Sequence, residues 1–151
     1  MPKKGRKIVQ ARKKVVDGIE FASTLEAYMY SLLKANGMNF DYEDKVYKIL
    51  LPFEYQEECW ERATRKSKAM IDRPKVREAK YTPDFVEENE EWVIEVKGRA
   101  NERFPMVWKL FKKLLTDRKQ KEPILFKPMN QEDCKQVIEI LKSKGYGKSK
   151  S

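Results

Sequence analysis

The chain has 151 residues, which is enough for one domain with a hydrophobic core of its own. It has no histidine and only two cysteines, Cys59 and Cys134, which excludes a Cys/His zinc site, a histidine-dependent catalytic triad and a disulfide framework. A metal would need oxygen ligands, which favours magnesium, with manganese as a substitute. No apolar run is long enough to span a membrane and no apolar segment follows the basic N-terminus, so we expect a cytoplasmic protein without a signal peptide.

The net charge of +9 is concentrated at the two ends of the chain. We expect residues 1–16 to form a flexible basic arm, residues 17–146 a single domain, and residues 147–151 a basic tail. The arm has two interpretations: it neutralises nucleic-acid phosphates by counterion release, or it only keeps the protein soluble or localises it. On the first interpretation its candidate phosphate contacts are Lys3, Lys4, Arg6, Lys7, Arg12, Lys13 and Lys14.

A helix is predicted to begin at Ser23-Thr24-Leu25-Glu26 and to end at Asn36-Gly37, because apolar residues recur there at helical spacing. Glu26 lies at the edge of the apolar stripe. With Ser23 it forms an S-x-x-E capping box, in which the glutamate carboxylate would accept a hydrogen bond from the Ser23 backbone amide. That role would compete with any role of Glu26 as a metal ligand.

Residues 40–53 are rich in β-favouring side chains and predict one strand, which Pro52 would end. Residues 54–80 form a charged insertion between core strands. One side of a helix in this insertion is suggested by four residues: Cys59, Trp60, Ala63 and Met70. Its basic residues fit either contacts with a DNA backbone or an ordinary solvated face.

The stretch YTPDFVEENEEWVIEVKG predicts a β-hairpin with an acidic turn. If Asn89-Glu90 is the centre of the turn, Asp84 lies opposite Glu95. Lys97 points to the same side of its strand as Glu95, because side chains alternate along a strand. Cross-strand neighbours are about 5 Å apart, and a divalent cation is the usual means of holding two carboxylates that close.

Residues 102–118 predict an amphipathic helix with three lysines facing outward. These lysines, together with the arginine after Gly98, are further candidate phosphate contacts: Arg99, Lys109, Lys112 and Lys113. A short strand is expected at Ile124–Phe126, followed by a helix that Asn130 caps and Gly145 ends. The closing Gly-Lys-Ser lacks the upstream glycine of a P-loop, so no nucleotide cofactor is expected.

The hairpin resembles the PD-(D/E)xK nuclease motif: Asp84 is followed by Glu95-Val96-Lys97, and Pro83 completes the leading Pro-Asp pair. The predicted order of elements is similar to the αβββαβ core of that superfamily. The resemblance implies an α/β, restriction-endonuclease-like fold with a mixed central sheet flanked by helices. It also implies a magnesium-dependent phosphodiesterase, in which Asp84, Glu95 and the Val96 backbone carbonyl bind the metal and Lys97 orients water or neutralises charge.

A second segment, STLEAYMYSLLKANGMNFDYE, resembles the Holliday-junction-resolving endonuclease I of T-seven-type phages, and YTPDF recurs in that family. This resemblance implies that Glu26 joins the metal site and the catalysis. It further implies branched DNA as substrate, a role in DNA recombination, and a homodimer. The segment VKGRANERFPMVWKLFKKLL resembles small phage-encoded nuclease-like proteins of unassigned role, which implies a phage protein acting in the bacterial host cytoplasm.

Two other functions are compatible with the same residues. One is a duplex nickase or restriction-like DNA nuclease. The other, from a different class, is a non-catalytic DNA-binding or packaging protein that keeps the nuclease fold.

Overall fold

The computed structural model describes residues 13–99 and 101–147, which have a mixed α/β fold. The chain divides into two compact units. The sheet unit takes in the described residues of 1–42, 84–100 and 123–151, and the ribbon unit consists of residues 43–83 and 101–122.

The sheet unit is built on four short strands in the order β12, β11, β10, β3. Strands β3, β10 and β11 run antiparallel to one another, whereas β12 is parallel to β11. The sheet is therefore mixed, as expected. The strands are β3 (Phe40–Tyr42), β10 (Phe85–Glu87), β11 (Trp92–Ile94) and β12 (Ile124–Phe126).

The hairpin of β10 and β11 has the predicted register. Phe85 lies opposite Ile94 and Val86 opposite Val93, and extending this register by one pair puts Asp84 opposite Glu95. The same register centres the turn on Asn89-Glu90, and Glu90 adopts the left-handed conformation, with a φ of 58°. Tyr81, however, ends the separate strand β9 in the ribbon unit, so the hairpin is shorter on its first side than the sequence suggested.

Two helices and a small hairpin complete the sheet unit. Helix α1 (Thr24–Ala35) and helix α3 (Gln131–Ser143) have the predicted N-caps, Ser23 and Asn130, and the two helices contact each other. Strands β1 (Lys14–Val16) and β2 (Ile19–Phe21) form an antiparallel hairpin, so the end of the expected arm of residues 1–16 has regular structure. Among the described residues, no helix is both long and apolar enough to cross a membrane.

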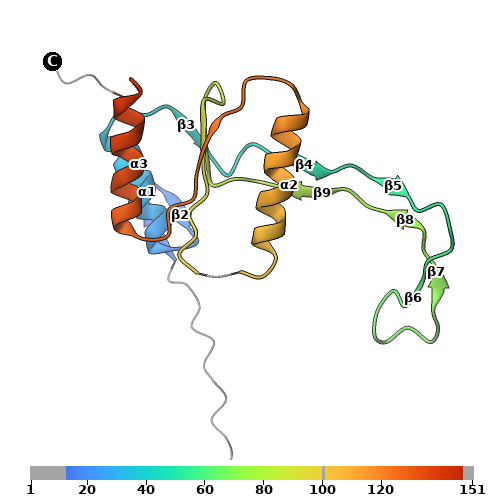
Figure 1. Ribbon diagram of the computed structural model, residues 1–151. Helices are drawn as coiled ribbons and strands as arrows, with labels where there is room; N and C mark the ends of the chain where they lie inside the picture. The colour runs from blue at the N-terminus through green and yellow to red at the C-terminus, as the bar shows by residue number, and fades with distance from the viewer. Residues whose placement is uncertain (1–12, 100, 148–151) are drawn as a thin grey trace, which may run out of the picture. The chain divides into compact units, whose positions relative to one another are not determined.

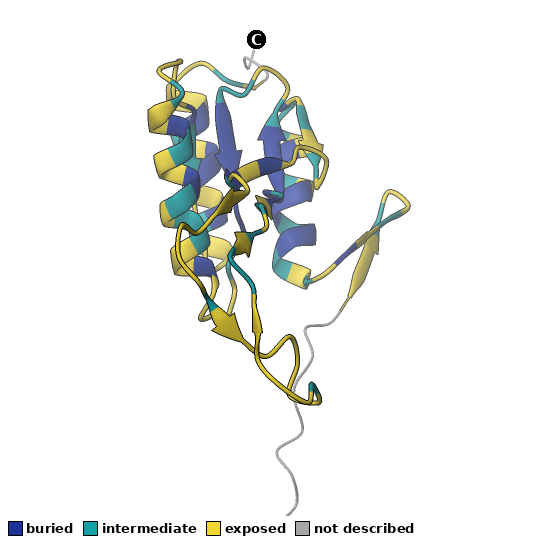
Figure 2. Cartoon of the chain, turned by 90° about the vertical axis from the view of Figure 1, so that its right-hand side faces the viewer, coloured by how far each residue is buried: buried dark blue, intermediate teal, exposed yellow. Residues whose placement is uncertain are grey.

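The core of the sheet unit lies between one face of the sheet and helices α1 and α3. Trp92, Ile94 and Val96 alternate along β11 and its continuation, and they pack with Leu33 of α1 and Leu141 of α3. The inward surfaces of the helices and strands are accordingly the buried ones (Figure 2). The alternation read from the sequence is therefore confirmed for this strand.

The ribbon unit consists of a long antiparallel ribbon and one helix. Tyr47 and Tyr81, which face each other on β4 and β9, pack their rings against Phe111 of the helix at centroid distances of 4.8 and 5.0 Å. Farther along, β5 pairs with β8 and β6 pairs with β7. The elements are β4 (Tyr47–Leu50), β5 (Phe53–Glu54), β6 (Trp60–Glu61), β7 (Ile71–Asp72), β8 (Lys75–Val76), β9 (Ala79–Tyr81) and α2 (Phe104–Asp117).

Two sequence predictions in this region are wrong. The single strand expected over residues 40–53 is three strands, because the chain turns at Glu43, whose φ of 46° is left-handed, and Pro52 separates β4 from β5. The helix suggested by Cys59, Trp60 and Met70 is instead part of the ribbon. Pairing with β7 holds Trp60 in a strand, and that partner is too far along the sequence for local periodicity to detect.

Candidate metal centre

Backbone hydrogen bonds position Asp84 and Glu95 next to each other at the open end of the β10–β11 hairpin. The Asp84 backbone N–H donates to Oε2 of Glu95 at 3.2 Å, and the Val96 N–H donates to Oδ2 of Asp84 at 2.8 Å. The Glu95 N–H donates to the Phe126 carbonyl at 3.0 Å, which continues the pairing of β11 with β12. Backbone geometry therefore fixes the positions of both carboxylates.

Glu26 reaches the same place from the first turn of α1. Its backbone N–H donates to Oγ of Ser23 at 3.1 Å, which is the predicted N-cap. Its carboxylate, however, does not complete the expected capping box with Ser23: Oε2 accepts from the Ala22 N–H at 3.3 Å and from the Tyr42 hydroxyl at 2.9 Å. Both hydrogen bonds orient the carboxylate, so its structural role does not compete with a position among other acids.

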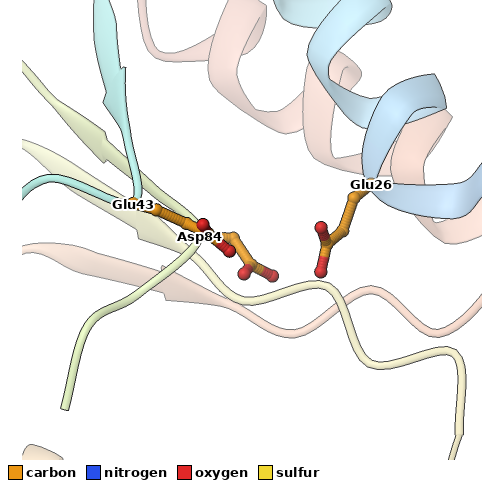
Figure 3. A group of neighbouring side chains, drawn as sticks. All are labelled: Glu26, Glu43 and Asp84. Carbon is orange, nitrogen blue, oxygen red and sulfur yellow. The ribbon is translucent and has the colours of Figure 1, made fainter. Parts of the chain in front are cut away.

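Glu26, Glu43 and Asp84 each offer a carboxylate oxygen, and these three oxygens lie within 4.8 Å of one another. Figure 3 shows the Glu26 carboxylate extending from α1 toward that of Asp84. Glu43 was not predicted as a site residue. It directly follows Tyr42, and extending the β3–β10 register beyond the Tyr42–Phe85 pair puts Glu43 opposite Asp84. The pairing of β3 with β10 joins distant segments, so local sequence patterns do not indicate that Glu43 lies near Asp84.

Burial sets three of the acids apart. Glu26, Asp84 and Glu95 are 9%, 6% and 8% exposed, and they are the buried charged residues within the described part of the chain. Burying a carboxylate is costly unless hydrogen bonds or opposite charges compensate. Lys97 supplies one positive charge, with Nζ 4.0 Å from Oε1 of Glu95 and its side chain 21% exposed. This lysine lies beside one of the three buried acids, and a bound divalent cation would stabilise the cluster further.

A family model matches residues 6–124, a range that includes every residue of this cluster. The chain belongs to the DUF1064 family, whose members are proteins of unknown function. No curated protein and no solved structure is similar to the chain.

The donor set of the DUF1064 protein fits a hard divalent cation. Every side chain of the acidic cluster offers oxygen, the ligand atom that magnesium and manganese prefer. The thiols lie elsewhere: Cys59 is in the ribbon, and Cys134 is buried in the core on α3. Burial, and secondarily the charge of Asp133, raises the pKa of the Cys134 thiol to about 11, so it stays protonated at neutral pH.

The residues expected to bind nucleic acid lie on several different elements of the DUF1064 protein. Lys13 and Lys14 are exposed at the start of the β1–β2 hairpin, and Arg99 is exposed two residues after Lys97. Three exposed lysines lie on α2, in the ribbon unit: Lys109, Lys112 and Lys113. The other expected contacts lie outside the described residues: Lys3, Lys4, Arg6, Lys7 and Arg12.

Proposed function

We propose that this DUF1064 protein is a magnesium-dependent endonuclease that hydrolyses DNA phosphodiester bonds. The observation that carries the proposal is that carboxylate oxygens of the buried residues Glu26 and Asp84 lie within 4.8 Å of each other. The buried Glu95 accepts a hydrogen bond from the Asp84 backbone N–H, and Lys97 lies 4.0 Å from Glu95. Two carboxylates at this distance repel each other, and a bound cation relieves the repulsion. A lysine next to a cation site suits reactions of charged phosphates.

The order of elements along the chain supports a restriction-endonuclease-like core. Along the chain come α1, the antiparallel strands β3, β10 and β11, then α2 and β12, with β12 parallel to β11. With the ribbon strands β4 to β9 left aside as an insertion between β3 and β10, this order resembles the αβββαβ core of the PD-(D/E)xK superfamily. The candidate acids fit this order: one is on α1, and two are at the open end of the β10–β11 hairpin.

Each residue has a chemical reason to be present. Glu26, Asp84 and Glu95 would hold magnesium, with the Val96 backbone carbonyl as a further oxygen ligand. When bound, the ion would lower the pKa of a water molecule and neutralise charge on the phosphate. Lys97 would orient the attacking water or stabilise developing negative charge, and lysine suits both tasks because it is a compact cation with three donors.

The proposed substrate is branched DNA, with the Holliday junction as the leading candidate. Two features support nucleic acid in general: the net charge of +9 and the exposed lysines and arginine near the sheet and on α2. The preference for a branch, a role in phage DNA recombination and the homodimer all rest on the resemblance to phage endonuclease I. Symmetric cutting of a junction requires two active sites, hence a dimer.

The decisive test is a cleavage assay with matched substrates. Purified protein is incubated with a synthetic four-way junction, with linear duplexes of the same arm sequences, and with supercoiled plasmid, in magnesium and in EDTA. Asp84→Ala removes a proposed ligand, and Glu139→Gln on α3, an exposed position, is the control for loss of one negative charge. We expect magnesium-dependent cutting of the junction by the wild type and the control, and none by Asp84→Ala.

The other outcomes identify the alternative functions. Equal cutting of junction and linear duplex would refute the branch preference and leave a general duplex nuclease. Binding of DNA without magnesium-dependent cutting would refute the enzyme and favour a non-catalytic DNA-binding protein. Light scattering at assay concentration tests the homodimer, and a monomer that cuts junctions would refute it.

A further inference from the structure

The far end of the ribbon carries a concentrated positive charge. We call residues 59–73 the ribbon tip. Within it, residues 62–71 hold four basic side chains and no acidic one, and all four are exposed: Arg62, Arg65, Lys66 and Lys68. So much charge of one sign on ten residues favours a polyanionic partner.

The ribbon tip also exposes large apolar side chains. Trp60, Met70 and Ile71 are 57%, 57% and 51% exposed. Single exposed apolar residues are ordinary. Three large ones on either side of one basic loop, however, indicate a binding surface. Basic residues next to an exposed tryptophan favour nucleic acid as the partner. Lysine and arginine contact phosphates, and tryptophan stacks on a base.

Hydrogen bonds define the conformation of the ribbon tip. The Arg73 N–H donates to the Cys59 carbonyl at 2.8 Å, and the Cys59 N–H donates to Oδ1 of Asp72 at 2.9 Å, which closes the base of the loop. At the apex, the Ser67 N–H donates to the Thr64 carbonyl at 3.1 Å, and the Thr64 N–H donates to Oγ of Ser67 at 3.1 Å. The basic residues are thus presented on a formed turn, which lowers the entropy cost of binding.

The shape of the ribbon suits a nucleic-acid groove. In Figure 1 the two antiparallel segments of the ribbon run from β4 and β9, past β5 and β8, to β6 and β7 at the end. Most of this length is exposed (Figure 2). The major groove of B-DNA is about 12 Å wide and admits a two-stranded antiparallel ribbon.

We propose that the ribbon tip is a second DNA-binding element, distinct from the metal centre. Arg65, Lys66 and Lys68 contact phosphates, and Trp60 packs against a base that is unstacked at a branch. The proposal rests on the proposed function in taking DNA as the partner. Tip-to-tip packing with a second copy of the chain is disfavoured, because it would bring two clusters of positive charge together.

The test measures binding without cleavage. Fluorescence anisotropy of a labelled four-way junction is followed in EDTA at several salt concentrations. The tip variant is Arg65→Ala/Lys66→Ala/Lys68→Ala. The control variant, Lys135→Ala/Lys142→Ala/Lys144→Ala, removes three exposed positive charges at α3 and its C-cap. Because all six positions are exposed, thermal unfolding of both variants should match that of the wild type.

We expect the tip variant to bind about tenfold or more weakly at 100 mM salt, and its salt slope to fall by about 2.7, the loss of three phosphate contacts. The control should stay within about twofold of the wild type. A tip variant that binds like the control would overturn the proposal, and so would a change from dimer to monomer in light scattering, which would make the tip a self-association surface. The two proposals can fail separately: tip-dependent binding without magnesium-dependent cutting refutes only the nuclease, and cutting with tip-independent binding refutes only the ribbon tip.

Discussion

The substitution Asp84→Asn tests the metal centre without requiring any substrate. It removes one negative charge from a buried cluster but keeps an oxygen that can accept the Val96 N–H. The Asp84 and Glu26 carboxylate oxygens lie within 4.8 Å of each other. At an effective dielectric constant of about 20, two full charges at that distance repel by about 3 kcal/mol.

Lys97, whose Nζ lies 4.0 Å from Oε1 of Glu95, offsets part of the negative charge of the cluster in the wild type. In EDTA we therefore expect Asp84→Asn to raise the free energy of unfolding by about 1–2 kcal/mol, or Tm by roughly 2–8 °C. Magnesium should stabilise the wild type more than Asp84→Asn. At a free concentration a hundredfold above Kd, binding stabilises the wild type by about 2.7 kcal/mol, and the variant should lose most of this gain.

Differential scanning fluorimetry of wild type, Asp84→Asn and the control Glu139→Gln, each with EDTA and with a magnesium series at constant ionic strength, measures both effects. The control should respond to magnesium like the wild type, because Glu139 is an exposed residue of α3. The reasoning is refuted if Asp84→Asn keeps the full magnesium-dependent rise in Tm. A variant that is less stable than the wild type in EDTA would refute the claim that repulsion dominates at this site.

Four further predictions use the same protein. Lys97→Ala should reduce junction cleavage by at least about a hundredfold while keeping the magnesium-dependent rise in Tm, because the lysine is proposed to act on water and phosphate and not as a ligand; loss of the thermal response would make it structural. Glu26→Gln should stay folded by circular dichroism, since its backbone N–H still reaches the helix cap, but should bind magnesium more weakly; a fully active variant would leave Glu26 with only its helix-terminus role. A thiol reagent at pH 8 should label Cys59 in the native protein and Cys134 only after denaturation, because burial raises the pKa of the second thiol to about 11; mass spectrometry of digested protein decides. Phe85→Ala should lower the free energy of unfolding by about 3–5 kcal/mol in chemical denaturation, since the ring is fully buried in the core, and a loss below about 1 kcal/mol would contradict that packing.

The resemblance to nucleases and the local chemistry agree on one hairpin, and this is where local signals are strongest. Alternation along a strand and a short turn determine which side chains share a face. The pairing of Asp84 with Glu95 follows from those two facts alone, and the register of β10 with β11 confirms it. The caps at Ser23 and Asn130 are similarly local, since each involves a backbone amide three residues away.

The ribbon shows where local signals fail. Trp60 belongs to a strand only because Asp72 lies across from it, and the polar loop between them gives no periodic pattern that would indicate this pairing. Strand formation depends on partners and burial more than on intrinsic preference. Here the partner is brought near by the two preceding short pairings, β4–β9 and β5–β8, neither of which the sequence indicates by itself.

The sequence by itself therefore determined the hairpin, its two carboxylates and lysine, the helix ends, and the absence of sulfur and imidazole ligands from the acidic site. The resemblance to phage endonuclease I also indicated Glu26, whereas only the tertiary structure brought Glu43 to the group and showed what orients the Glu26 carboxylate. Glu43 lies near Asp84 because β3 pairs with β10, and Glu26 is oriented by Tyr42, a residue on that same strand. The physical reason is that a metal centre of this kind depends on contacts between segments about forty to sixty residues apart, whereas sequence patterns report only on neighbours along the chain.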